Sequence, residues 1–183
     1  EARGHEVFPV LFTHPQNADK EWALKHSDDT KTYFTREWGD NVDDWNSHNS
    51  PSRVARNWGE QAMLIQAQHY ASPSYPYTCY DVLYQTSRQH VGGCLWHSFD
   101  HQRGYHPDPF YGGIMDVFRQ PKFSYYMFMA QRPAVKDDQL AGSGPMVYIA
   151  HEMTPFSGKD VTVYSNCDEV RLTFNKGGKT YTY

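Results

Sequence analysis

The segment from Gly92 to Asp100, GGCLWHSFD, constrains the fold of this chain more than any other segment. It opens on two glycines, continues through apolar residues and carries its polar residues toward its carboxyl end. A short apolar run of this kind is typical of a strand that is buried on both faces of a parallel sheet. Because helices cover the faces of parallel sheets, the run predicts an α/β layer.

The preceding and following segments supply further elements for this layer. Two strands are expected, at His5–Thr13 and at Thr32–Thr35, where β-branched and aromatic residues gather. Helices are expected at Glu21–Lys25, Val54–Ala71, Tyr80–His90 and Pro121–Gln131. The second of these helices is expected to have Ser52 as its cap and to bury a face formed by Trp58, Ala62, Ile65 and His69.

The hydrophobic period changes to two beyond a charged, glycine-containing linker. Strands are predicted at Met146–Ala150, Asp160–Tyr164 and Glu169–Phe174, and the residues Lys179–Tyr183 have the pattern of an unfinished strand. The predicted organisation is an α/β domain over residues 1–135, a linker over 136–144 and the start of an antiparallel β-sandwich over 145–183. We expect the chain to be a piece of a longer protein.

Composition excludes several classes of function. The 17 basic and 21 acidic residues give a net charge of -4 without basic runs, which argues against nucleic acid as the main partner. No stretch approaches the ~18 apolar residues of a membrane span. The three cysteines have no C-x-x-C spacing, so they form neither a disulfide scaffold nor a zinc ribbon. The aromatic content of 16% favours either sugar binding or dense core packing.

Glu37 is the first candidate for a chemical role. It follows the strand expected at Thr32–Thr35, and it lies between Arg36 and Trp38. In a β/α barrel the carboxyl ends of the strands carry the catalytic groups, so a carboxylate here suits a nucleophile or a base. The alternative is a surface glutamate paired with Arg36.

Trp96 and the polar residues after it form the second candidate. An indole at the end of a buried strand is suited to stacking on a sugar ring, and the alternative is a core tryptophan. His97, Asp100, His101 and His106 have side chains of the types that bind transition metals, but their spacing matches no established motif. His97 and His101 would need a helix to share a face. The sequence therefore favours a polar substrate-binding loop, with no metal and no cofactor.

Several motifs, taken in order, resemble glycoside hydrolase family 2. The segments that carry the resemblance are Thr35–Gly39, Gly92–Asp100, Tyr111–Asp116, Arg119–Lys122, Ser124–Tyr126 and Val163–Leu172. The resemblance implies the C-terminal part of a TIM (β/α)8 barrel followed by part of an immunoglobulin-like β-sandwich. It also implies a retaining glycosidase that acts on an oligosaccharide or polysaccharide.

The same resemblance implies roles for individual residues. Glu37 would be the catalytic nucleophile, and Trp96 would line the subsite of the sugar that is cleaved off. Asp40 falls where β-galactosidases place a sugar-contacting residue, and His97 and Asp100 would lie at the rim or support the site. The implied substrate-binding set is Trp38, Asp40, Asn41, Trp96, His97 and Asp100.

The chain departs from the family pattern in ways that bear on mechanism and substrate. Family members carry an acid/base Glu in an Asn-Glu pair before the nucleophile, and no glutamate before Glu37 follows an Asn here. The Asn-x-Lys pair that holds a uronic acid in β-glucuronidases is replaced by Phe110-Tyr111-Gly112, which disfavours a uronic acid. A terminal β-galactoside fits better, with agar- or porphyran-type galactans as a candidate source.

Two other functions remain open from the sequence. One is a non-catalytic carbohydrate-binding protein on a hydrolase scaffold, and the other is a metal-dependent hydrolase that uses His97, His101 and His106. The family resemblance implies a bacterial periplasmic or secreted protein. The sequence leaves the oligomeric state open.

Overall fold

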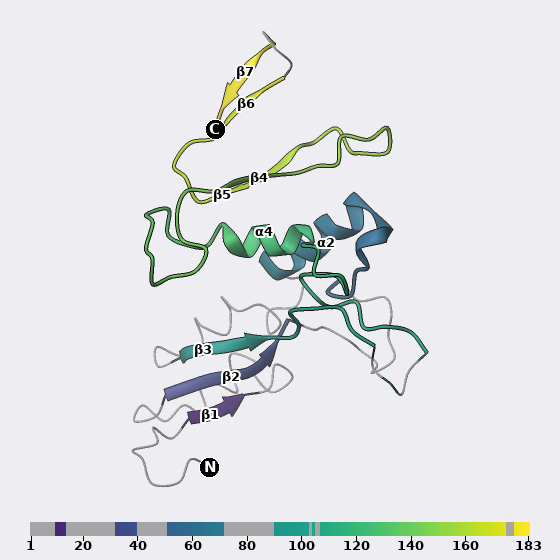
Figure 1. Cartoon of the computed structure of the whole chain (residues 1–183), viewed down its shortest axis with the longest axis vertical. Helices are drawn as coiled ribbons and strands as arrows, with labels where there is room; N and C mark the ends of the chain where they lie inside the picture. Colours follow the sequence, from purple (N-terminus) through teal and green to yellow (C-terminus); the bar gives the residue numbers. More distant parts are fainter. Residues whose placement is uncertain are drawn as a thin grey trace, which may run out of the picture.

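The computed structural model describes residues 10–13, 32–39, 51–71, 90–102, 104, 107–174 and 178–183. The elements within these residues are β1 (Val10–Thr13), β2 (Thr32–Trp38), η2 (Arg56–Trp58), α2 (Glu60–Ala71), β3 (His90–Leu95), α4 (Phe123–Met129), β4 (Val147–Ala150), β5 (Thr162–Ser165), β6 (Arg171–Thr173) and β7 (Thr180–Thr182). Figure 1 shows the first three strands at one end of the molecule, α2 and α4 in the middle and the last four strands at the other end.

β1, β2 and β3 form a parallel sheet in that order. The register aligns Phe12 with Phe34 and Trp38 with Leu95. The predicted parallel strand at Gly92–Asp100 is confirmed in its first part only, because the chain leaves the sheet after Leu95. The strand predicted at Thr32–Thr35 is confirmed and extends to Trp38. Of the first predicted strand, the described residues contain Val10–Thr13, and these form β1.

The helix predicted from Val54 is interrupted by Gly59. A 3-10 turn, η2, comes first, and α2 begins only at Glu60. Gly59 has a φ of 91°, which an α-helix cannot contain, so the turn and the helix are separate elements. Ser52 therefore does not cap this helix, contrary to the prediction. It is fully buried, and its carbonyl accepts a hydrogen bond of 2.9 Å from Gln66 Nε2.

The buried face of α2 also differs from the predicted one. Trp58 and Ile65 are about half exposed, at 52% and 53%. The apolar side chains that are buried are Met63, Ala67 and Tyr70, and the polar side chain of Gln66 lies among them. The hydrophobic pattern alone gave the wrong face because a glutamine whose amide is fully bonded occupies a core position. Of the predicted face, His69 is buried and Ala62 is half-buried against the core.

The core lies between α2 and α4 and continues to the first antiparallel pair. It consists of Val54, Met63, Ala67, Tyr70, Phe123, Met127 and Ala150. The helix predicted at Pro121–Gln131 is confirmed as α4, which is shorter at both ends. Helices predicted at Glu21–Lys25 and at Tyr80–His90 lie outside the described residues, except for His90, which begins β3.

The C-terminal strands form two antiparallel pairs, β4–β5 and β6–β7. The three strands predicted after the linker are confirmed within two residues of their ends, and the predicted unfinished strand is β7. The Tyr148 ring of β4 stacks on Tyr126 of α4 with 3.5 Å between ring centroids and 6° between planes. This stack fixes the first antiparallel pair to the helical layer.

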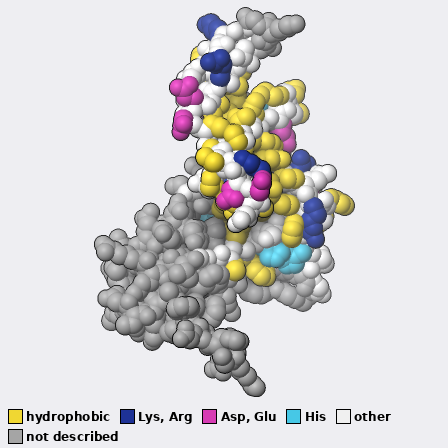
Figure 2. Space-filling view, turned by 60° about the vertical axis from the view of Figure 1, so that its left-hand side comes forward, with side chains coloured by type: hydrophobic (Ala, Val, Ile, Leu, Met, Phe, Trp, Pro, Cys, Tyr) yellow, Lys and Arg dark blue, Asp and Glu magenta, His cyan; other side chains and the backbone are white. Residues whose placement is uncertain are grey.

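An apolar groove lies between the two antiparallel pairs. It has a volume of about 540 Å³ and is lined by Lys159, Asp160, Val161, Val163, Val170, Leu172, Phe174, Tyr181 and Tyr183. Figure 2 shows hydrophobic side chains gathered over this half of the molecule. Within the described residues no helix is long and apolar enough to cross a membrane. Cys94 and Cys167 are free and exposed, and Cys79 lies outside the described residues.

Glu60, the first residue of α2, joins the helical layer to the loop between β4 and β5. Its buried carboxylate accepts hydrogen bonds from the Ser157 hydroxyl at 2.6 Å and from the backbone N–H groups of Glu152 and Gly158. His151 Nδ1 lies 3.9 Å away. Burial by itself raises the pKa of Glu60, but these hydrogen bonds outweigh it and hold the pKa below the ordinary value of 4.5.

We expect Glu60→Gln to reduce the free energy of unfolding by about 1–3 kcal/mol at neutral pH, because charge-assisted bonds become neutral ones. A depressed pKa means that the carboxylate stabilises the fold above its unfolded-state pKa, and this contribution is lost as the pH falls through the folded-state pKa. Urea unfolding should therefore show the difference between variant and wild type shrinking on acidification. Glu169→Gln, at an exposed position, is the control, and a pH-independent difference would contradict the prediction.

Candidate active site

The carboxyl ends of β2 and β3 lie side by side at one edge of the parallel sheet. Trp38 is in register with Leu95, so Glu37 comes just before this paired position and Trp96 just after it. The arrows of β2 and β3 point the same way in Figure 1. Parallel α/β sheets hold their ligands at this edge. Four predicted site residues lie outside the described part, wholly or in their side chains: Glu37, Trp38, Asp40 and Asn41.

Gly39 allows the chain to leave β2 directly under α2. Its φ is 101°, and a Cβ at this position would lie 2.6 Å from Leu95 Cδ1 and 3.0 Å from Tyr70 Cε1. His69 Nε2 donates a hydrogen bond of 3.3 Å to the Gly39 carbonyl. Both the backbone conformation and the available space therefore require glycine. The end of β2 that carries Glu37 is held against α2 and β3.

Trp96 and His97, joined by a cis peptide bond, begin the segment after β3. Both side chains are half-buried. The Trp96 ring lies edge-on to His101 and to Phe110, each with 6.1 Å between centroids. Phe110 is only 2% exposed, and its ring packs against those of Trp96 and His101. A half-buried indole backed by other rings presents a flat apolar surface, which is the kind of surface that packs on the C–H face of a sugar.

The imidazoles of His97 and His101 lie next to each other, with 4.6 Å between ring centroids. The prediction that the two histidines would need a helix to share a face is wrong. An isolated antiparallel bridge between His101 and Phe110 turns the chain back, and both Nδ1 atoms approach the Phe99 carbonyl, at 2.6 and 3.3 Å. No group of three or more metal-ligating side chains occurs among the described residues, and His106 lies outside them.

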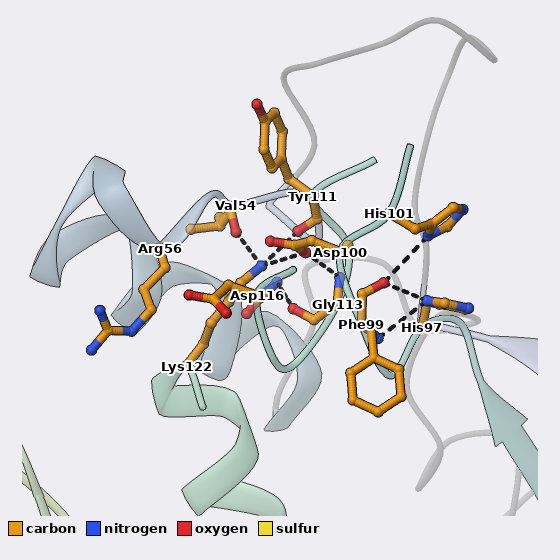
Figure 3. A network of polar contacts seen from close by, with 12 residues as sticks. Val54, Arg56, His97, Phe99, Asp100, His101, Tyr111, Gly113, Asp116 and Lys122 are labelled. Carbon is orange, nitrogen blue, oxygen red and sulfur yellow. Dashed lines mark hydrogen bonds and ion pairs between the residues drawn. The ribbon is translucent and has the colours of Figure 1, made fainter. Parts of the chain in front are cut away.

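Asp100 forms a buried ion pair with Lys122. Figure 3 shows the two side chains pointing toward each other, and Lys122 Nζ lies 2.7 Å from Asp100 Oδ1. The same carboxylate oxygen accepts a bond of 2.9 Å from the Gly113 N–H. Burial raises the pKa of Asp100 and lowers that of Lys122, and the attraction between the two charges opposes both shifts. Asp100 thus supports the segment after β3 from inside the molecule.

α2 holds the segment that runs beside Trp96 and His97. The Tyr70 hydroxyl donates a bond of 3.1 Å to the Gly112 carbonyl, and Gln66 Nε2 donates one of 3.3 Å to the Gly113 carbonyl. The Ser124 hydroxyl of α4 donates to Gln66 Oε1 at 2.7 Å. Side chains from α2 and α4 therefore hold the backbone of Gly112 and Gly113, which lies next to the carboxyl end of β3.

Comparison with known proteins relates the chain to glycosidases. No protein-family model matches the chain. Its sequence is similar to a beta-galactosidase of Thermoanaerobacter pseudethanolicus, with 33% identity over 93 aligned residues that cover 46% of this chain and 12% of that protein. The chain therefore spans a small part of the length of this relative. The match supports a relationship to glycoside hydrolases of the beta-galactosidase kind.

Two solved structures overlap the chain in part. Beta-glucuronidase of Parabacteroides merdae has a TM-score of 0.44 and 22% identity, covering 77% of this chain and 17% of that chain. Beta-glucuronidase 3 of Bacteroides uniformis has a TM-score of 0.43 and 18% identity, covering 82% of this chain and 20% of that chain.

Lys122 and Gln66 are not among the residues for which the sequence predicts a role. Lys122 entered only as part of the motif Arg119–Lys122, between a proline and an apolar helix. That context was the available signal. Gln66 carries no comparable signal, because its three partners come from three distant segments.

Proposed function

We propose that the chain is the C-terminal part of the catalytic barrel (residues 1–135), a linker (136–144) and the start of an immunoglobulin-like sandwich (145–183) of a retaining glycoside hydrolase. The observation that carries this proposal is the parallel pairing of β2 with β3. It brings the backbone of Glu37 and of Trp96 to the carboxyl edge of the sheet, where barrel enzymes hold their substrates. The sequence match to a beta-galactosidase supports the same class of reaction.

In this proposal Glu37 is the nucleophile. Its carboxylate attacks the anomeric carbon while a second carboxyl group protonates the leaving oxygen, so that the glycosidic bond breaks as a glycosyl–enzyme ester forms. Water then cleaves this ester with the second group as base, and the anomeric configuration is retained. The Asn-Glu pair that supplies this second group in the family does not occur before Glu37 in this sequence, so we assign the role to no residue of the chain.

The remaining site residues bind the sugar or hold those that do. Trp96 forms the apolar wall of the sugar subsite, and His97 lies at its rim. Trp38, Asp40 and Asn41 supply further contacts after β2. We assign Asp100 to support, since it is 4% exposed and bonded to Lys122.

The proposed substrate is a terminal β-galactoside. The beta-galactosidase match supports this choice, and Phe110-Tyr111-Gly112 offers no cation for the carboxylate of a uronic acid. Oligosaccharides of agar- or porphyran-type galactans are the natural extension of this class. We further propose a bacterial protein that acts in the periplasm or outside the cell.

The full-length protein should cleave an aryl β-galactoside and leave an aryl β-glucuronide intact. Proton NMR of the first product should show the β-anomer, because two inversions at one carbon give net retention. A 2-deoxy-2-fluorogalactoside with a good leaving group should label the peptide that contains Glu37, as detected by mass spectrometry. An inverted product, or a label on another carboxylate, would remove Glu37 from this role. Galactoside binding without turnover would favour a carbohydrate-binding protein.

A further inference from the structure

Lys122 is the largest fully buried side chain of the described residues, with 0% exposure. It stands immediately before α4, at the N-cap position, but its side chain makes no capping hydrogen bond to the helix. An ammonium group is costly to bury unless each of its protons meets an acceptor. Three acceptors surround Nζ: Asp100 Oδ1 at 2.7 Å, the Tyr111 carbonyl at 2.9 Å and the Val54 carbonyl. All three protons of the cation are therefore used.

These three acceptors belong to three segments that are far apart in the sequence. Val54 precedes η2 and α2, Asp100 follows β3, and Tyr111 belongs to the segment that returns beside it. Figure 3 shows the ammonium group at the point where these segments converge. One cation thus holds together the chain entering α2, the chain leaving β3 and the chain returning toward α4.

The segment that Lys122 holds is also the one that positions Trp96 and His97. The His97 N–H donates to the Gly112 carbonyl at 3.3 Å, and the Ile114 N–H donates to the His97 carbonyl at 3.1 Å. Gly112 lies one residue after Tyr111, whose carbonyl accepts from Lys122. The path from the ammonium group to the peptide between Trp96 and His97 therefore consists of adjacent residues and direct hydrogen bonds.

We propose that Lys122 is a positioning residue for the sugar-binding Trp96–His97 segment. By neutralising Asp100 and holding the Tyr111 carbonyl, it fixes the backbone from Tyr111 to Ile114. His97 is hydrogen-bonded to this segment through both its N–H and its carbonyl. The indole then keeps one orientation relative to the carboxyl end of β2. This inference rests on the proposed function for its role in catalysis, whereas the positioning of the indole stands on the contacts alone.

The test uses the full-length protein and the double variant Lys122→Met/Asp100→Asn. Removing both charges avoids a buried, unpaired carboxylate, so the double variant should fold. With an aryl β-galactoside we expect KM to rise about tenfold or more while kcat changes less than about threefold. The misplaced indole weakens binding of the sugar, whereas the groups that break the glycosidic bond are unchanged. A merely structural role would lower the active fraction, which reduces kcat and leaves KM unchanged. That result would overturn the proposal.

A second measurement reads the indole without any activity. In protein labelled with 5-fluorotryptophan, the fluorine resonance of Trp96 is identified by its loss in Trp96→Phe. It should shift or split in the double variant, and an unchanged resonance would overturn the proposal even if the protein proves to be no galactosidase. If the double variant does not fold, Asp100→Asn alone should move KM and the resonance in the same directions. Lys136→Met/Asp138→Asn, which removes one exposed charge of each sign, is the matched control and should change neither.

Discussion

Glu37→Gln is expected to reduce turnover of an aryl β-galactoside by the full-length protein by a factor on the order of 10⁴ or more. The amide has nearly the same shape as the carboxylate but is a poor nucleophile, so the glycosyl–enzyme ester does not form. The backbone of β2 keeps its parallel pairing with β1 and β3, so the thermal unfolding temperature should stay close to that of the wild type.

Two further variants make this result specific. Glu169→Gln changes an exposed glutamate in the same way and should keep wild-type turnover. Glu37→Ala supplied with azide should regain turnover and give the α-galactosyl azide, since the small anion replaces the missing nucleophile. Turnover close to that of the wild type in Glu37→Gln would exclude Glu37 as the nucleophile. Loss of turnover together with loss of folding would assign it a structural role instead.

The parallel sheet could be predicted because its signal is local. The glycine-led apolar run of β3 and the β-branched, aromatic residues of β2 determine the strand type in their own windows. The antiparallel strands after the linker follow from a period of two in the same way. α2 was placed correctly as a helix, but its start and its buried face were not. Both errors come from two residues, Gly59 and Gln66, whose effects depend on a backbone angle and on distant partners.

The support of the candidate site is not local, and this is why the sequence did not reveal it. Asp100 was expected at the rim or in support, and its partner could not be named, because Lys122 meets it only after the chain has passed through a long loop. The pairing of His97 with His101 likewise depends on the bridge to Phe110. Residue types and spacing identify candidate chemistry, whereas backbone carbonyl acceptors from other segments decide which of the charged side chains can be buried.

Gly113→Ala is expected to lower the free energy of unfolding by about 3 kcal/mol or more. The atoms nearest to the added methyl group belong to the backbone, and they can move away only by breaking hydrogen bonds. A Cβ here would lie 2.3 Å from the backbone nitrogen of Asp100 and 2.6 Å from the carbonyl oxygen of Met115. These two atoms are hydrogen-bonded to each other at 2.9 Å. Moving them apart also pulls the Gly113 N–H from the Asp100 carboxylate.

Urea unfolding of the full-length protein, followed by a probe in the layer of α2 and α4, measures this loss. Gly158→Ala is the matched control, since a Cβ there would first meet the Gln61 side-chain amide at 3.2 Å, and that amide can swing away. It should change stability by less than about 1 kcal/mol. Equal stability of the two variants would contradict the prediction. It would mean that the backbone around Gly113 can move away from Asp100 and Met115 at little cost in free energy. A loss confined to Gly113→Ala would instead show that the close approach of this backbone to Asp100 and Met115 stabilises the segment after β3.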